Sequence, residues 1–419
     1  MHIKNTRTLI KGSELRKHVL LILESGLQAI DPKAAVQEKM MIRNNAVFCG
    51  NARIDLRKFR RIFFVGIGKA ALSTAQGVEA VFGDRITDGI ALDIRTGPLK
   101  YMRSIAGTHP FPSKKNIRAT EEIKTMVSEL KKDDLVIAAI TGGGSALLCS
   151  APEMTCEEEV AVVRRCFAAG ATIEELNTLR KHISDIRGGG LARLAYPATI
   201  LSLIISDTPG CSMDMVASGP TLYDPTTVKD AQNIQKKYTL PKFSLFETPK
   251  EKKYFSHVVN TLLLCNMDAL NAMHHQALSL GYKAKVLGSA LSGEARTVVH
   301  RYAQDIHPCE VLIGGGETTV TLRGKGIGAR NQEVVLGALP FLGKGMVVAS
   351  INSDGLDNTD AAGAIADHET RIRAKKIACA PREYLARNDS YYFFEKLDDL
   401  IRTGPTGTNV SDLFVLLRE

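Results

Sequence analysis

A turn that could bind phosphate follows an apolar run near the start of the chain. The segment FFVGIGKAAL, residues 63–72, is broken by Gly66 and Gly68 and continues with Lys69 and small residues. The glycines permit a tight turn, and a helix beginning there offers free N–H groups and a positive dipole end to an anion. Lys69 adds a movable cation, which favours phosphoryl transfer over the binding of a dinucleotide. A glycine turn with an exposed lysine explains this motif alone equally well.

A second glycine loop is ITGGGSALL, in which Gly142, Gly143, Gly144 and Ser145 separate an apolar run from a predicted helix. Successive N–H groups in such a loop form a concavity that binds anions, and the serine can add a hydroxyl or cap the helix. The P-loop pattern G-x-x-x-x-G-K-[ST] is absent. Packing accounts for one or two glycines, whereas three in succession favour the close approach of a ligand.

A cationic helix face is predicted in LNTLRKHISDIRGGGLARLA. Apolar residues recur there at helical spacing, while Asn177, Arg180, Lys181 and Ser184 share another face. A solvated surface is the alternative interpretation. Because three glycines follow directly, we expect this face to meet a ligand, with Lys181 in contact with the nucleotide.

Acidic residues follow two further apolar runs. SDTPG contains Asp207, and INSDGLDNTDAAGA contains Asp354, Asp357 and Asp360. Carboxylates in this position could hold Mg²⁺, which usually takes one or two protein carboxylates together with phosphate oxygens. We predict Asp207 and Asp354 as the metal ligands and the other two as turn formers.

The segment IGGGETTVTLRGKGIGARNQEVVLGAL combines glycines with charge. We expect a strand, a glycine loop with Gly316 and Glu317 that contacts the nucleotide, a short alternating strand TVTL, and a mobile glycine-rich link carrying Lys325. Arg330 would begin the next helix. A flexible cationic segment suits phosphoryl transfer, whose transition state is stabilised by positioned charge.

These motifs follow apolar runs that alternate with helical patterns, which predicts an α/β fold. Runs without polar alternation, separated by helices, indicate parallel sheets covered on both faces. In such sheets ligands lie beyond the carboxyl ends of the strands, where the motifs occur. The predicted strands are 61–68, 88–94, 134–144, 198–207, 309–316 and 345–354.

The length of 419 residues predicts two three-layer α/β/α lobes with mostly parallel sheets, the first of them Rossmann-like. We place the N-terminal domain at residues 1–240 and the C-terminal domain at 241–419. The segment 223–260 lacks a long apolar run and is the predicted crossover. The final apolar strand could pair with either sheet.

Composition excludes several classes of protein. Hydrophobic residues make up 44% and charged residues 24%, ordinary values for a globular protein. The net charge of +9 is scattered along the chain, so we expect no nucleic-acid partner.

No apolar stretch is long enough to span a bilayer and no signal peptide is recognisable, which predicts a cytoplasmic protein. The eight cysteines lack a C-x-x-C pair and are predicted to be reduced thiols.

The motifs together resemble the type II glycerate kinases, the MOFRL family of glycerate 2-kinases. The resemblance covers almost the whole chain and rests on these segments in this order: GIGKAA, GTHPFPSKKN, ITGGGSALL, LRKHISDIRGGGLA, ASGPT, GGGETTVTLRGKGIGARNQE, SDGLDNTDAAGA and GPTGTNVSDL. It implies an ATP-dependent kinase that phosphorylates D-glycerate, in many members at the 2-hydroxyl, in a cleft between two lobes. A monomer or homodimer is expected.

The resemblance also assigns roles to residues of this chain. It places the family's lysine at Lys69, its arginine at Arg330, its strand-end aspartates at Asp207 and Asp354, and its C-terminal asparagine at Asn409. Lys69 and Arg330 would stabilise the transferred phosphoryl group, and Asp207 would accept the hydroxyl proton. Many members carry an acidic residue where this chain has Cys211.

Two rival functions remain open at this point. GIGKAA followed by Asp93, which could bind ribose hydroxyls, is compatible with a nicotinamide-dependent oxidoreductase acting on a hydroxy acid. Phosphorylation of glycerate at the 3-hydroxyl is a second alternative, and a nucleotide sensor without catalysis is a third. The oxidoreductase leaves the cationic glycine link unexplained, and the sensor leaves the acidic strand ends unexplained.

Overall fold

The computed structural model describes residues 1–419, which form two compact units. The unit that we call Rossmann-like comprises Pro32–Ser206 and Ser212–Leu264. The other, which we call the C-terminal unit, comprises Met1–Asp31, Asp207–Cys211 and Cys265–Glu419. The chain therefore passes between the units several times.

This division differs from the predicted domains 1–240 and 241–419. Residues 223–260 lie inside the Rossmann-like unit and do not form the crossover, and residues 1–31 belong to the C-terminal unit. The physical reason is the helix α2, Glu14–Ala29, whose apolar face, including Val19 and Leu23, is buried against α11 and β15. A helix needs such a face to be covered, wherever in the sequence the covering residues lie.

The Rossmann-like unit is built on a six-stranded sheet of order β6-β5-β4-β7-β8-β9, in which the neighbouring pairs from β6 to β8 are parallel. The chain starts in the middle at β4, moves outward to β6, and continues on the other side with β7, as in doubly wound folds. A small antiparallel sheet of β1, β2 and β3 accompanies it. The strands are β1 Met40–Arg43, β2 Ala46–Cys49, β3 Ala52–Asp55, β4 Arg61–Ile67, β5 Asp88–Asp93, β6 Arg103–Ala106, β7 Asp134–Thr141, β8 Thr199–Ser206 and β9 Val258–Cys265.

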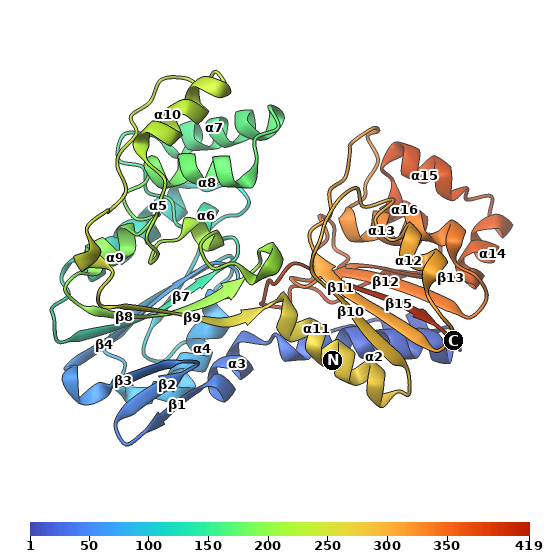
Figure 1. The fold of residues 1–419 in the computed structure, drawn as a ribbon, viewed down its shortest axis with the longest axis horizontal. Helices are drawn as coiled ribbons and strands as arrows, with labels where there is room; N and C mark the ends of the chain where they lie inside the picture. Colours follow the sequence, from blue (N-terminus) through green and yellow to red (C-terminus); the bar gives the residue numbers. More distant parts are fainter. The chain divides into compact units, whose positions relative to one another are not determined.

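Helices cover both faces of this sheet, with α3 and α4 on one side and α5 and α9 on the other (Figure 1). The central strands are apolar along their whole length, and β7 is buried at every position, which requires cover on both faces. The helices are α3 Pro32–Lys39, α4 Ala71–Phe82, α5 Lys114–Ser128, α6 Gly144–Leu147, α7 Cys156–Ala168, α8 Ile173–His182, α9 Gly190–Ala195 and α10 Val228–Lys237.

The sheet of the C-terminal unit has the order β10-β11-β15-β12-β13-β14 and is mixed. Only β10 and β11 pair in parallel, so the prediction of a mostly parallel second sheet is wrong. The final strand, β15, runs antiparallel between β11 and β12 and assigns the C-terminus to this unit, and β13 is antiparallel to both of its neighbours, β12 and β14. The strands are β10 Lys283–Leu291, β11 Glu310–Gly316, β12 Met346–Asn352, β13 Gly363–Asp367, β14 Leu400–Ile401 and β15 Asp412–Arg418.

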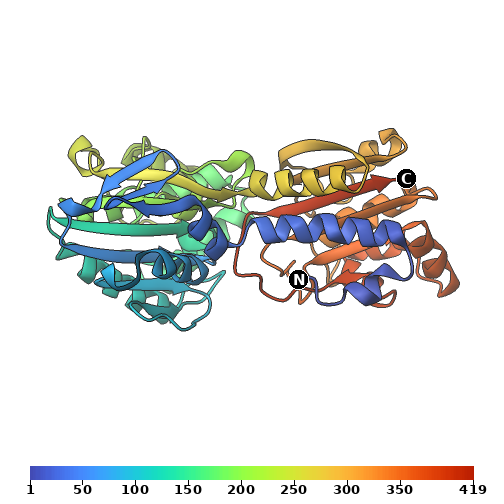
Figure 2. The same cartoon turned by 90° about the horizontal axis from the view of Figure 1, so that it is seen from below.

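Helices α2 and α11 lie side by side on one face of this sheet, with β15 beside them (Figure 2), while α13 packs against β12 and β13 from the other face (Figure 1). No helix of the chain is both long and apolar enough to cross a membrane. The helices are α1 Thr6–Ile10, α2 Glu14–Ala29, α11 Asn266–Ser279, α12 His300–Asp305, α13 Arg330–Ala338, α14 His368–Lys376, α15 Pro381–Arg387 and α16 Ser390–Glu395.

Candidate functional site

The two glycine loops predicted to bind phosphate adjoin each other in the Rossmann-like unit. They follow β4 and β7, the neighbouring strands at which the strand order reverses and at which such folds bind their ligands. The backbone N–H of Lys69 donates to the carbonyl of Gly142 at 2.9 Å. Gly68 has φ +117°, and a Cβ there would lie 2.1 Å from Thr141 Oγ1. Close contact between the loops therefore requires glycine at this position.

The side chain of Lys69 lies against the second loop. A Cβ at Gly143, which has φ +78°, would be 3.0 Å from Lys69 Cγ. Two other glycines serve packing, because a Cβ at Gly144 would be 2.5 Å from Ala217 Cβ and one at Gly66 would be 2.7 Å from the Phe64 ring. The structure thus brings Lys69 to the TGGGS loop, while Gly66 and Gly144 are explained by the core.

Ser145 is part of a chain of polar side chains that the sequence analysis did not foresee. Its hydroxyl is 2.9 Å from the hydroxyl of Ser218, which donates to Asn177 Oδ1 at 2.9 Å. Ser218 and Ala217 adopt left-handed backbone conformations, with φ of 58° and 50°. Non-glycine residues rarely adopt this conformation, and it is concentrated at functional sites.

The predicted cationic face of α8 is divided between two environments. Lys181 Nζ lies 3.2 Å from the buried carboxylate of Asp224. Although burial opposes the shift, the charge of Lys181 lowers the pKa of Asp224. Lys181 is therefore engaged in an internal ion pair, and its contact with a nucleotide stays a prediction. Arg180, on the same helix, lines a pocket instead.

The three glycines after α8 have a structural explanation. The N–H groups of Gly188 and Gly189 donate to the carbonyls of Ser218 and Gly219 at 2.9 and 2.8 Å. A Cβ at Gly190 would lie 2.3 Å from the carbonyl oxygen of Asp185. These glycines permit the backbone to approach the Ser218 loop, which weakens their interpretation as a sign of a nearby ligand.

Asp93 does not occupy the position that a ribose-binding carboxylate needs. It is fully buried, and its two oxygens accept hydrogen bonds from the N–H groups of Leu72 at 3.0 Å and Ile94 at 2.6 Å. Burial raises the pKa of this carboxyl group. Asp93 holds the start of α4 in place, so the feature that supported a dinucleotide site has a structural role.

A second group of candidate residues surrounds Arg330 in the C-terminal unit. Arg330 is the first residue of α13, and its Nη1 donates to Glu317 Oε1 at 2.5 Å. Its Nη2 donates to Asp412 Oδ1 at 3.3 Å. Asn331 Nδ2 donates both to Asp412 Oδ1 at 2.8 Å and to Asp357 Oδ1 at 3.2 Å. We refer to Glu317, Arg330, Asn331, Asp357 and Asp412 as the Arg330 cluster.

The buried carboxylates of this cluster are strongly perturbed. Burial, reinforced by the charge of Asp412, raises the pKa of Asp357 to about 7. Burial also raises the pKa of Asp412 to about 6, although Arg330 opposes the shift. Burial disfavours the charged form of Arg330, but the surrounding carboxylates outweigh it and raise the pKa of Arg330 above its ordinary value. Perturbed groups of this kind are typical of functional sites.

The glycines before Arg330 are required for close packing. A Cβ at Gly316 would lie 2.3 Å from the carbonyl oxygen of Leu291. Glycines 324, 326 and 328 each approach the backbone of residues 387–390, and the N–H of Gly326 donates to Arg387 O at 2.9 Å. These glycines let the segment that carries Lys325 approach the end of α15, and its mobility stays a prediction. The TVTL segment makes an isolated bridge at Thr319 and no strand.

Asp207 and Asn409 meet although they are far apart in the sequence. Asn409 Nδ2 donates to Asp207 Oδ2 at 3.1 Å, and the hydroxyl of Ser411 donates to the carbonyl of Asp207. The same C-terminal loop reaches Asp354, whose carbonyl accepts from the N–H of Thr406 at 3.1 Å. The loop before β15 thus links the predicted strand-end aspartates to the Arg330 cluster through Asp412.

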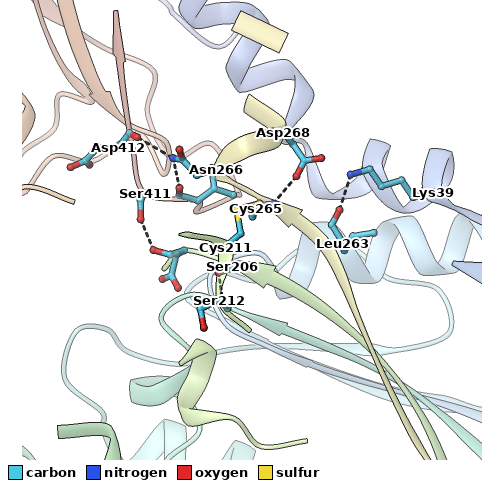
Figure 3. The surroundings of a disulfide bond; sticks show 12 residues. Lys39, Ser206, Cys211, Ser212, Leu263, Cys265, Asn266, Asp268, Ser411 and Asp412 are labelled. Carbon is cyan, nitrogen blue, oxygen red and sulfur yellow. Dashed lines mark hydrogen bonds between the residues drawn. A yellow bond between two sulfur atoms is a disulfide. The ribbon is translucent and has the colours of Figure 1, made fainter. Parts of the chain in front are cut away.

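A disulfide bond anchors the segment that carries Asp207. Cys211 and Cys265 are joined with their Cα atoms 5.5 Å apart, so the prediction that all cysteines are reduced is wrong for this pair. Spacing could not reveal it, because the two residues are separated by 54 positions. Figure 3 shows the bond beside Asn266, which donates to the carbonyls of Val410 at 2.8 Å and Asp412 at 3.1 Å. Cys211, at the usually acidic position, therefore fixes the Asp207 segment covalently.

Asp207 and Asp354 offer oxygen ligands of the kind that Mg²⁺ prefers, and both side chains are half-buried in the same unit. The protein contains no group of three or more His, Cys, Asp and Glu side chains arranged to hold a metal ion by themselves. A magnesium ion carried on nucleotide phosphates needs only one or two such carboxylates. The residues present fit that use.

Comparison with known proteins gives consistent matches over the whole chain. A domain of unknown function, DUF4147, matches residues 18–245, and the MOFRL family model matches residues 310–412. The D-glycerate 2-kinase of Thermotoga maritima is 32% identical, with 96% of this chain and 98% of the relative covered. The chain belongs to the MOFRL family of glycerate kinases.

Two further comparisons concern a solved structure and a relative that is named for a different reaction. The crystal structure of the Thermotoga maritima glycerate kinase has a TM-score of 0.83 at 32% identity, covering 97% of this chain and all of that one. A protein of Agrobacterium vitis named as a putative hydroxypyruvate reductase is 37% identical over 94% of this chain and 93% of its own. The predicted family is confirmed, and the name of the Agrobacterium relative corresponds to the oxidoreductase alternative.

The sequence analysis missed several residues of the candidate site of this glycerate kinase family member. Asp412 and Ser218 stand in the quoted motifs GPTGTNVSDL and ASGPT but received no role, and Asn331 directly follows Arg330. Asn331 follows a helix start, which was an available signal, whereas Asp412 begins β15 and Ser218 ends a short 3-10 turn, so the position of these two gave no such signal. Asp357 was predicted as a turn former, whereas the structure buries it and bonds it to Asn331.

Proposed function

We propose that this chain is an ATP-dependent kinase that phosphorylates D-glycerate at its 2-hydroxyl group. The family includes relatives named for this reaction, such as the D-glycerate 2-kinase of Thermotoga maritima. The observation that carries the proposal is the contact of Lys69 with the TGGGS loop where the strand order reverses. Glycine loops at this place suit the phosphates of a nucleotide, and a lysine suits their charge.

In this proposal the phosphates of ATP lie along Gly68, Lys69 and the loop from Gly142 to Ser145. Backbone N–H groups of the TGGGS loop bind the phosphate oxygens without the entropy loss of long side chains, whereas the N–H groups of Gly68 and Lys69 donate to the carbonyls of Leu92 and Gly142. The predicted nucleotide contacts of Gly316, Glu317 and Asn409 belong to the same proposal. Glu317 also forms an ion pair with Arg330, which orients the guanidinium.

The chemical roles follow from charge. Lys69 and Arg330 neutralise the charge on the transferred phosphoryl group, and Asp207 accepts the proton of the 2-hydroxyl. Phosphoryl transfer passes through a loose transition state, so positioned charge contributes more than a strong base. Asp207 and Asp354 would hold Mg²⁺, which would supply positive charge to neutralise the phosphates.

The experiment is a coupled assay of ADP release from ATP, with and without D-glycerate. Release that requires D-glycerate supports the kinase. Binding of ATP with no dependence of ADP release on D-glycerate would support the nucleotide sensor instead. A change of nicotinamide absorbance with glycerate would support the oxidoreductase. The internal hydrogen bonds of Asp93 disfavour that last alternative, because they leave no carboxylate for the ribose.

The remaining expectations complete the proposal. Transfer to the 3-hydroxyl is the closest alternative and gives a different product. We expect a cytoplasmic enzyme, as a monomer or homodimer, with D-glycerate as its small-molecule substrate and without nucleic-acid or membrane partners.

A further inference from the structure

A partly buried arginine lies beside the TGGGS loop. Arg180 lines a small pocket of the Rossmann-like unit together with Ser145, Ala146, Glu159 and residues 110–112. Its Nε is buried and has no hydrogen-bond partner. Burying a charged group costs several kcal/mol unless the charge is compensated. The absence of an acceptor for the N–H group at Arg180 Nε therefore needs an explanation.

The carboxylate of Glu159, which lines the same pocket, is already used by another arginine. Glu159 Oε1 accepts from Arg187 Nη1 at 2.7 Å, and Glu159 Oε2 accepts from the thiol of Cys149 at 3.4 Å. Arg187 also donates to the carbonyl oxygens of Leu148 at 3.1 Å and Ser145 at 2.8 Å. Two guanidinium groups thus face one buried carboxylate, and Arg180 carries the excess positive charge.

The pKa of Arg180 agrees with this excess of positive charge. Burial lowers the pKa of Arg180 to about 10, and the charge of Arg187 acts in the same direction. The pocket therefore favours an anion, and a guanidinium can bind both oxygens of a carboxylate at once.

We infer that Arg180 binds the carboxylate group of the substrate in the pocket between α8 and the TGGGS loop. This inference rests on the proposed function, because it takes D-glycerate to be the acceptor. In D-glycerate the carboxylate is bonded to the carbon that carries the 2-hydroxyl. A carboxylate held at Arg180, next to Ser145, therefore brings that hydroxyl close to the loop proposed to bind the phosphates of ATP.

The test compares Arg180→Gln with two matched arginine variants. Arg187→Gln removes a buried arginine that has a partner, and Arg164→Gln removes an exposed one. Binding of D-glycerate and of a non-hydrolysable ATP analogue is measured by calorimetry for each folded variant, and KM values are measured where turnover is detectable. Arg180→Gln should weaken D-glycerate binding about 10- to 100-fold, the effect of losing hydrogen bonds between charged groups, and change the binding of the ATP analogue less than twofold.

Thermal unfolding without ligand supplies an independent readout. Arg180→Gln should unfold at the same temperature as the parent or higher, because it removes an uncompensated buried charge, whereas Arg187→Gln should unfold at a lower temperature. Arg164→Gln should leave both binding and unfolding unchanged.

Several results would overturn the inference. Unchanged binding of D-glycerate to Arg180→Gln would do so while leaving the proposed kinase intact, provided that the parent protein phosphorylates D-glycerate. Loss of the ATP analogue in place of D-glycerate would assign the pocket to a nucleotide phosphate. A parent protein that neither binds nor phosphorylates D-glycerate would remove the proposed function and this inference together.

Discussion

Replacing both cysteines of the Cys211–Cys265 disulfide by serine should destabilise the protein strongly. The bond joins residues 54 positions apart, so it restricts the unfolded chain considerably. The chain-entropy relation gives about 3 kcal/mol for a loop of about 15 residues and about 4.7 kcal/mol for about 100 residues, which places this loop at about 4 kcal/mol. For units of this size the corresponding loss in unfolding temperature is about 10 °C.

The assay is thermal and urea unfolding of the oxidised parent, the reduced parent and the Cys211→Ser/Cys265→Ser variant. The reduced parent and the variant should agree, and the reductant should have no effect on the variant. Cys309→Ser is the matched control, because Cys309 is exposed and unpaired, and it should unfold like the oxidised parent. Equal unfolding temperatures for the oxidised parent and the double variant would refute the reasoning.

Three further predictions follow from the charged groups. Alanine at Lys69 or Arg330 should lower turnover about 10²- to 10⁴-fold without loss of folding, as steady-state ADP release and circular dichroism would show, and unchanged turnover in either variant would remove its assigned role. The pKa of Asp357 is raised to about 7, so between about pH 4 and pH 7 the folded protein keeps a proton that the unfolded chain releases. The stability that this group contributes is therefore present below about pH 4 and is lost as the pH rises to about 7. Asp357→Asn should flatten this part of the curve of unfolding free energy against pH, and an unaltered curve would contradict the assignment. Arg16→Met should cost about 3–5 kcal/mol in urea unfolding, because it leaves the buried carboxylate of Asp367 without the guanidinium 2.5 Å away, and a loss below about 1 kcal/mol would show that the pair is dispensable.

Local patterns predicted much of the fold and supplied the candidate residues of the site. The predicted apolar runs correspond to β4, β5, β7, β8, β11 and β12, and the order of strands and helices predicted the α/β class. Lys69 and the TGGGS loop could be recognised because ligand-binding residues in such folds directly follow strands, and this relation is local in the sequence.

The features that were missed depend on contacts between distant segments. The pairing of β15 between β11 and β12 and the docking of α2 on the C-terminal unit involve opposite ends of the chain, so no local period reveals them. The glycines near Lys325 indicated flexibility, but they permit close packing, and a sequence alone does not distinguish these two uses of glycine.

Charge compensation is likewise invisible in sequence. Lys181 and Arg180 are adjacent in the same helix, yet Lys181 has Asp224 as a partner and Arg180 has an unmet donor. Only the folded structure shows which of two neighbouring cations is available to a ligand.

Phosphorus NMR of the reaction between ATP and D-glycerate tests the central claim most directly. The account predicts a product resonance assigned to 2-phosphoglycerate, formed together with ADP, and its loss when Lys69 or Arg330 is replaced by alanine. A spectrum in which ATP and D-glycerate remain unchanged with the folded protein and Mg²⁺ present would contradict the account, and a resonance of 3-phosphoglycerate would contradict the assigned position of transfer.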